Sequence, residues 1–160
     1  MMIYVAGPVF TLAERRFNEE LASELERLCP SLQVFLPQRY DTEFHGLPDF
    51  SQRMFACLMG ALDRCDAVVA ILDGPEADSG TSFEMGYARG RAKKVIGVRT
   101  DFRGGEDHGL NLMLTNACSD LLTEPSTTTT LGRLAERIVK VLAAGESLPP
   151  QQTNEGSLLP

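Results

Sequence analysis

Residues 67–74 read AVVAILDG, a continuous run of small and β-branched apolar side chains that ends in an aspartate and a glycine. A run with no polar residue at alternate positions is typical of a strand buried on both faces of its sheet. The next stretch, DSGTSFEMGYA at 78–88, has the composition of a turn that leads into a helix. This unit decides the fold class, because doubly buried strands occur almost only in parallel sheets covered by helices.

Other segments of the chain repeat this alternation. Apolar runs of strand length lie at 2–7, 33–37 and 95–100, with a weaker one at 119–122, and amphipathic helical patterns lie at 11–28, 50–65, 81–94 and 127–144. We therefore predict an α/β fold in which right-handed crossovers cover both faces of a parallel five-stranded sheet. The length of 160 residues suits one domain, over 1–144, and the proline-containing 145–160 is predicted to be a flexible C-terminal tail.

The overall charge and residue usage exclude several classes of function. The formal net charge is -7 and the basic residues are scattered apart from RGRAKK at 89–94, which argues against a nucleic-acid polymer as partner. No apolar run is long enough to cross a bilayer and no cleavable leader is visible, so we expect a soluble, cytoplasmic protein without a membrane partner.

Metal and cofactor signatures are missing from the sequence as well. The four cysteines have no CxxC spacing and are accompanied only by His45 and His108, so neither a metal site nor a disulfide framework is expected. Both histidines fall in polar loops and are predicted to be solvated. The chain has no GxGxxG and no GxxxxGK[ST], the glycine cradles of dinucleotides and triphosphates, so we predict no cofactor.

A candidate site follows from the fold, because ligands of open parallel sheets bind outside the carboxyl ends of the strands. The segments 7–10, 73–81 and 100–111 each follow a predicted strand and should converge on one cleft. Glu84 is the most informative residue, and it has two interpretations. With Thr81 it fits the capping box S/T-x-x-E, whereas beside Asp78 it is an acid near a helix N-terminus, where the field favours the ionised form that a nucleophile needs.

Aromatic and apolar residues near the same cleft are also open to two interpretations. Tyr4, in the first predicted strand, is either a core aromatic or a phenol aimed at the cleft. Phe10 and Met113 are either ordinary apolar packing or the lining of a slot for a flat ring.

Three motifs in order resemble the nucleoside 2-deoxyribosyltransferases over about residues 2–120. They are IYVAGPVF at 3–10, AVVAILDG with DSGTSFEMGYA at 67–88, and LNLMLTNA at 110–117. The resemblance implies a flavodoxin-like, doubly wound sheet and a cleft for a deoxyribonucleoside. It also implies that Glu84 attacks the anomeric carbon, expels the base and forms a covalent deoxyribosyl-enzyme that a second base captures, while Tyr4 orients the glutamate.

The same resemblance implies roles in substrate binding. Asp78 would hold the sugar hydroxyls and Phe10 would flank the base, with Gly7 and Gly80 in the turns that carry them. Asn111 and Met113 resemble residues that the family lends to the active site of a neighbouring subunit, so a homo-oligomer is implied.

One departure from the family pattern concerns the leaving base. Leu58 stands eight residues ahead of Asp66, where the family usually has an acid that helps to protonate the base, and Asp49 or another loop residue is the candidate replacement. A sister group, the 2'-deoxynucleoside 5'-phosphate N-hydrolases, typically has serines at the positions of Asp78 and Asn111, and an anion at 78 would repel a 5'-phosphate. A nucleoside or 5'-monophosphate N-hydrolase and a nucleoside-binding module with weak activity remain the alternatives.

Overall fold

The structure, a computed structural model, describes residues 1–103 and 110–144. The predicted tail at 145–160 and His108 lie outside the described residues. In chain order the elements are β1 (Met2–Ala6), α1 (Leu12–Leu28), β2 (Gln33–Phe35), the 3-10 turn η1 (Pro37–Arg39), α2 (Asp41–Phe44), α3 (Phe50–Arg64), β3 (Ala67–Ile71), α4 (Ser79–Gly90), β4 (Lys94–Arg99), α5 (Leu112–Ala117), β5 (Asp120–Thr123) and α6 (Leu131–Ala143). No helix within these residues is long and apolar enough to span a bilayer.

The strands form one parallel sheet in the order β2-β1-β3-β4-β5. β1 and β3 are neighbours at its centre, with Val5 opposite Val69. The strand order reverses direction between them, which is the switch point of a flavodoxin-like doubly wound sheet. The predicted parallel sheet of five strands is therefore confirmed, including the weak last strand, because β5 pairs with β4 through Asp120 to Thr123.

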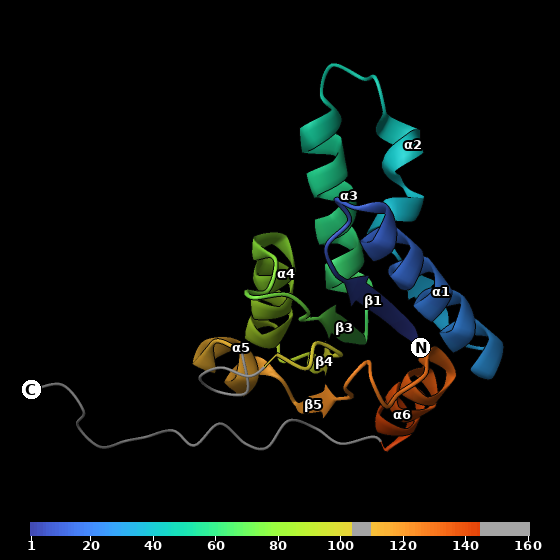
Figure 1. Cartoon of the computed structure of the whole chain (residues 1–160). Coiled ribbons are helices and arrows are strands. Elements are labelled where there is room, and N and C mark those ends of the chain that lie inside the picture. Colours follow the sequence, from blue (N-terminus) through green and yellow to red (C-terminus); the bar gives the residue numbers. More distant parts are fainter. Residues whose placement is uncertain (104–109, 145–160) are drawn as a thin grey trace, which may run out of the picture.

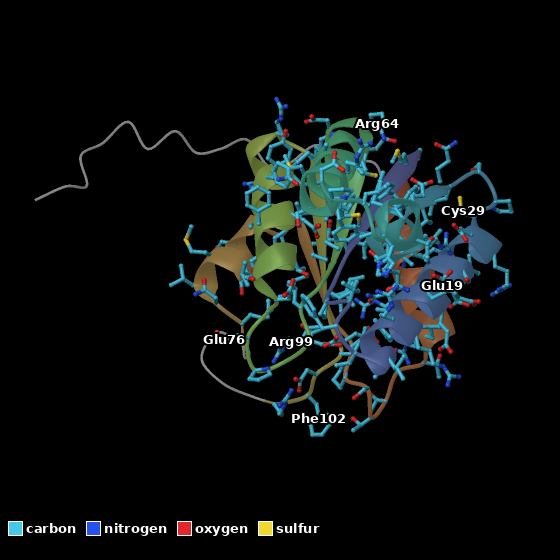
Figure 2. The ribbon with its side chains drawn as sticks, turned by 90° about the horizontal axis from the view of Figure 1, so that it is seen from above. Glu19, Cys29, Arg64, Glu76, Arg99 and Phe102 are labelled. Carbon is cyan, nitrogen blue, oxygen red and sulfur yellow. The ribbon has the colours of Figure 1, made fainter. Side chains whose placement is uncertain are left out.

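Helices cover both faces of the sheet. α1 and α6 pack together on one face, and α3, α4 and α5 lie on the other (Figure 1; Figure 2 shows the same layers from above). The core between the sheet and the first pair is formed by Ile3, Val5, Leu21, Leu25, Val69, Ile96, Leu134 and Ile138. The core on the opposite face is formed by Tyr4, Ala6, Leu62, Val68, Ala70, Met85, Ala88 and Val95.

The segment between β2 and α3 is more ordered than the predicted polar loop over 38–49. It contains η1 and the short helix α2, which ion pairs tie to α1. Arg15 Nη1 lies 2.8 Å from Asp41 Oδ2, and Arg39 Nη2 lies 2.7 Å from Glu19 Oε1. Hydrophobic periodicity carries no signal for such long-range charge pairs. The sequence therefore could not predict that η1 and α2 pack against α1.

At Gly97 side chains pack closely on the backbone of β4. A Cβ there would lie 2.5 Å from Cys118 Sγ and 2.9 Å from Leu121 Cδ1, whereas Gly86, in α4, has nothing within 4 Å of an added Cβ. The side chains that follow α5 therefore pack directly on the backbone of β4.

We predict that Gly97→Ala lowers the free energy of unfolding by about 1–3 kcal/mol, because the added methyl overpacks a filled core. Gly86→Ala should raise it by about 0.5–1 kcal/mol, because alanine loses less backbone entropy in a helix. Urea unfolding of the two variants and the parent protein measures both effects. Equal stability of the two variants would show that Cys118 and Leu121 do not limit the space at Gly97.

Candidate active site

A short hydrogen bond joins Tyr4 of β1 to Glu84 of α4. The Tyr4 hydroxyl donates to Glu84 Oε1 at 2.5 Å, and the tyrosine is fully buried. Within the described residues no hydrogen bond reaches Glu84 Oε2. Of the two interpretations of Tyr4, the structure therefore supports a phenol aimed at the candidate nucleophile, on a ring that is also part of the core.

The local structure around Glu84 differs from the predicted capping box. α4 begins at Ser79, and its N-cap is Asp78, whose Oδ2 accepts from Thr81 N at 2.9 Å and from Thr81 Oγ1 at 3.1 Å. Of the two interpretations of Glu84, the capping box with Thr81 does not form, because Asp78 supplies the cap three residues earlier. Glu84 is instead the sixth residue of α4, with its carboxylate turned toward β1.

The environment of Glu84 favours its protonated form. Burial raises the pKa of Glu84 to about 7, the hydrogen bond from Tyr4 opposes this rise, and the charge of Asp78 adds to it. The helix field that the sequence predicts to favour the ionised form falls off within the first turn, and at the sixth residue of α4 burial acts against it. The pKa of Tyr4 is raised by burial and then by the nearby Glu84 charge, so the phenol keeps its proton and remains a donor.

Two further aromatic rings form a stack with the Tyr4 ring. The Tyr4 ring stacks on Phe35 with centroids 5.2 Å apart, and Phe35 stacks on Tyr40 at 4.5 Å. The stack runs from β1 through β2 to the start of α2. Sequence reasoning missed both residues, because Phe35 reads as an ordinary apolar residue of the strand predicted at 33–37 and Tyr40 as part of the polar loop after it.

The turns that carry the remaining predicted residues are tightly held. A Cβ on Gly7 would lie 3.1 Å from Ile71 Cγ1, and a Cβ on Gly80 would lie 3.1 Å from Asp78 Oδ2. The Phe10 amide donates to Glu14 Oε2 at 3.0 Å, which fixes the backbone entering α1, while the Phe10 side chain is 78% exposed. Gly7 and Phe10 lie in the loop after β1, and Gly80 is the second residue of α4, just after the loop that follows β3.

Asn111 and Met113 lie at the start of α5 and are not brought together with Glu84 by any described contact. Asn111 caps α5, with its Oδ1 accepting from Met113 N at 2.8 Å, and the Met113 side chain is 70% exposed. Leu110, just before them, is buried in the core that contains Tyr4. The two side chains are therefore anchored at their base and project outward.

Leu58 occupies the position where the family resemblance implies an acid. Leu58 of α3 is half-buried against the core cluster that contains Tyr4. Asp49 forms an ion pair with Arg53 at 2.8 Å, and this hydrogen bond lowers the pKa of Asp49. A carboxyl held in its ionised form has no proton to give, so Asp49 is a poor replacement for the acid.

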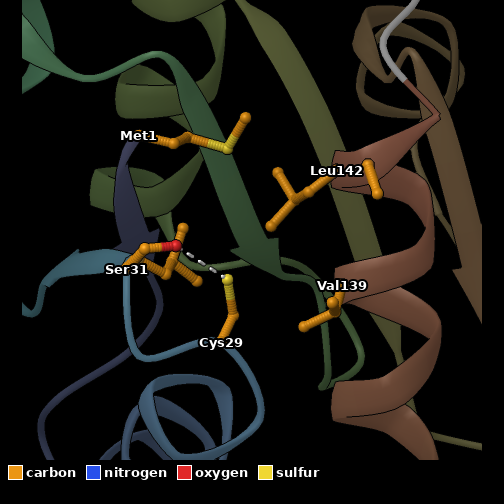
Figure 3. A pocket seen from close by; sticks show the side chains of 7 residues that line it. Met1, Cys29, Ser31, Val139 and Leu142 are labelled. Atoms are coloured by element: carbon orange, nitrogen blue, oxygen red, sulfur yellow. Dashed lines mark hydrogen bonds between the residues drawn. The ribbon is translucent and has the colours of Figure 1, made fainter.

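A pocket of 190 Å³ lies at the opposite end of the sheet, where the chain begins. It is lined by Met1, Cys29, Ser31, Leu32, Val139, Leu142 and Ala143. The Cys29 thiol lies 3.5 Å from the Ser31 hydroxyl, and a dashed line marks this contact in Figure 3. None of the candidate residues lines this pocket. Elsewhere in residues 1–103 and 110–144, no group of three or more His, Cys, Asp or Glu side chains is arranged to hold a metal ion.

The family model described as nucleoside 2-deoxyribosyltransferase matches residues 3–114. The chain belongs to this family. The matched segment contains Tyr4, Asp78, Glu84, Asn111 and Met113, so every side chain of the candidate site falls within the part shared with other nucleoside 2-deoxyribosyltransferases. The family is enzymatic. No curated protein matches the chain.

Solved structures share the fold of this family member. A conserved protein from Enterococcus faecalis V583 is 26% identical, with a TM-score of 0.69, over 88% of this chain and 98% of that one. A 2-deoxyribosyltransferase from Bacillus psychrosaccharolyticus is 21% identical, with a TM-score of 0.65, over 78% and 87%. The CMP N-glycosidase of Clostridium botulinum is 16% identical, with a TM-score of 0.58, over 87% and 99%.

We predict that Tyr4→Phe raises the pKa of Glu84 above about 7, because the phenol donation that lowers it is lost while the burial remains. Carboxyl 13C NMR of the folded protein measures this titration. Tyr40→Phe is the matched control, since it removes a hydroxyl from the far end of the same stack and should leave Glu84 unchanged. An unchanged or lower pKa in Tyr4→Phe would mean that the hydrogen bond does not stabilise the carboxylate.

Glu84→Gln should stabilise the protein more at pH 8 than at pH 4. The pKa of Glu84 is about 7 in the folded protein against 4.5 for an ordinary glutamate, so the folded state holds a proton that the unfolded chain releases in this window. Stability therefore falls as the pH rises from about 4.5 to 7, by about 3 kcal/mol for a difference of about 2.5 units. Urea unfolding at both pH values measures the gain, and a gain that does not depend on pH would contradict the assignment.

Proposed function

We propose that this protein is a nucleoside 2-deoxyribosyltransferase, which cleaves the N-glycosidic bond of a 2'-deoxynucleoside through a covalent Glu84 intermediate and transfers the sugar to another nucleobase. The observation that carries the proposal is the buried Glu84 carboxyl held by the Tyr4 hydroxyl at 2.5 Å. A strongly raised pKa beside a specific hydrogen-bond partner is typical of a reacting group rather than of a structural acid.

The proposed reaction consists of two displacements at the anomeric carbon. Glu84 Oε2 forms a bond to C1' as the bond from C1' to the base nitrogen breaks, and the base departs with a proton. The nitrogen of a second base then attacks C1', loses a proton and releases the carboxylate. Each step inverts the anomeric centre, so the β configuration is retained, as in glycosidases that use a carboxylate nucleophile.

Tyr4 divides the two oxygens of Glu84 between different roles. Its hydroxyl occupies Oε1, so Oε2 is the oxygen left for the sugar. At neutral pH a carboxyl with a pKa of about 7 is partly ionised, and burial makes its anion more basic than that of an exposed glutamate. The phenol also limits how far the pKa rises, which keeps a reactive fraction present.

Substrate binding is assigned to the loops around this pair. Asp78 has one oxygen committed to the α4 cap, and within the described residues its Oδ1 has no partner, so Oδ1 is the group proposed to accept a hydrogen bond from a sugar hydroxyl. Phe10 would flank the base, and Gly7 and Gly80 would let the backbone approach the sugar. The charge of Asp78 favours free nucleosides over 5'-phosphates.

A homo-oligomer is part of the proposal. Phe83 on α4 and Leu112 and Met113 on α5 are all exposed, and the two helices pack against each other. Apolar side chains gathered on neighbouring helices are typical of a surface that another chain covers. Asn111 and Met113 would then reach the active site of the neighbouring subunit, where Met113 would meet the base.

Intact-protein mass spectrometry after mixing with deoxyinosine, without an acceptor base, tests the proposal. We expect a mass increase of one deoxyribosyl group, located on the peptide that contains Glu84, and its loss when adenine is added, with deoxyadenosine as the product. Glu84→Gln should form no adduct. Glu76→Gln, which changes an exposed glutamate in the preceding loop, should form it like the parent protein.

The products also separate the proposal from its competitors. Free deoxyribose released at a rate that ignores added base would identify a hydrolase. Thermal stabilisation by nucleosides without turnover, unchanged in Glu84→Gln, would identify a binding module.

A further inference from the structure

Arg99 is a charged side chain buried where β4 ends. It is 2% exposed, and strand alternation puts it on the same face of the sheet as Val95 and Gly97, which is the face that carries Tyr4. Within the described residues no carboxylate lies within ion-pair distance of its guanidinium. Burial of a charge without a countercharge is costly, and an apolar side chain of similar length would be cheaper for stability.

The guanidinium binds the backbone that leaves β3. Its Nη1 donates to the carbonyl of Leu72 at 2.6 Å and to that of Gly74 at 3.2 Å, while its Nε is buried without a partner. Figure 2 shows Arg99 beside the loop that carries Glu76, which connects β3 to α4. Arg99 therefore holds the start of the loop that leads to the candidate site.

Further hydrogen bonds join the same two segments. Asp73 accepts from the Thr100 amide and hydroxyl, each at 2.5 Å, and from the Asp101 amide at 2.8 Å. Asp101 in turn accepts from the Gly74 amide at 3.2 Å. Together with the Arg99 contacts these bonds form a brace, which joins residues 72–74 to residues 99–101.

The path from the brace to Asp78 is short. Gly74 has a φ of 112°, a conformation that L side chains rarely adopt, and the ring of Pro75 fixes the next φ. Only residues 75–77 separate the brace from Asp78, whose carboxylate caps α4. A displacement of Leu72 or Gly74 would therefore move both oxygens of Asp78. These are Oδ2, which caps α4, and Oδ1, which is proposed to bind the sugar.

We propose that Arg99 is a positioning residue that sets the place of the Asp78 carboxylate through this brace. The role of Asp78 toward the sugar rests on the proposed function, whereas the effect of Arg99 on the α4 cap does not. Arg99 acts through Asp78 and touches no substrate.

Hydrogen exchange measures the structural half of the proposal without any turnover. The Thr81 amide donates to Asp78 Oδ2, so its protection reports the cap. In Arg99→Met we expect Thr81 to exchange at least about tenfold faster, while amides of α6 change only with global stability. Ile138→Ala, in the core on the opposite face, is the control for lost stability. Thr81 protection that falls no further than in this control would overturn the brace.

A double-mutant cycle measures the functional half in the full-length protein. Arg99→Met should raise the KM for deoxyinosine about tenfold with a smaller change in kcat, and should have no further effect on KM in the Asp78→Ala background. An equal rise in KM in both backgrounds would show that Arg99 acts elsewhere.

Two further comparisons keep the test decisive. If Arg99→Met does not fold, Thr100→Val removes one bond of the same brace, and the same changes in Thr81 exchange and KM are expected from it. If the parent protein does not turn over deoxynucleosides, the proposed function fails, and the exchange of Thr81 still decides whether the brace exists.

Discussion

The hydrogen bond between Tyr4 and Glu84 is the constraint on which the candidate site depends. The two residues are 80 positions apart, and they meet because β1 and β3 are neighbours in the sheet and α4 returns across the face that carries the Tyr4 ring. A carboxyl in this core would have few polar contacts without the phenol. The phenol supplies one strong donor to one oxygen, so the other oxygen remains available for chemistry.

This arrangement lowers stability at neutral pH. Burial raises the pKa of Glu84 to about 7, and ionisation at neutral pH therefore acts against the folded state. The surrounding structure offsets that cost through rigid elements. The stack from Tyr4 to Tyr40 holds the donor ring, and the bonds between residues 72–74 and 99–101 hold the start of the loop that leads to α4. Strain at reacting groups supported by rigid neighbours is common in enzymes.

Local sequence patterns predicted the sheet well, because the apolar runs at 67–74 and 95–100 report burial on both faces directly. They predicted the site only in part. Asp78 and Thr81 are both good N-cap residues, so the pattern could not tell which of them starts α4, and the choice depends on where the preceding loop is held. The partner of Glu84 depends on packing between distant elements, which local periodicity does not record.

Arg99 was missed for a related reason. In VIGVRT it reads as the polar end of a strand, and its burial arises only because the loop after β3 folds back over it. Leu58 remains the chemical question of the site, since an apolar side chain stands where the family usually has an acid and Asp49 is held ionised by Arg53. In the proposed reaction the departing base would therefore take its proton from another residue, from a neighbouring subunit or from water.

The most direct test of Glu84 as the nucleophile is the time course of base release from deoxyinosine in the absence of an acceptor, followed by rapid quench. A covalent intermediate predicts a burst of one equivalent of base per subunit, with a rate that rises with pH around the Glu84 pKa of about 7. Base release without a burst, at a rate that Glu84→Gln leaves unchanged, would contradict the account.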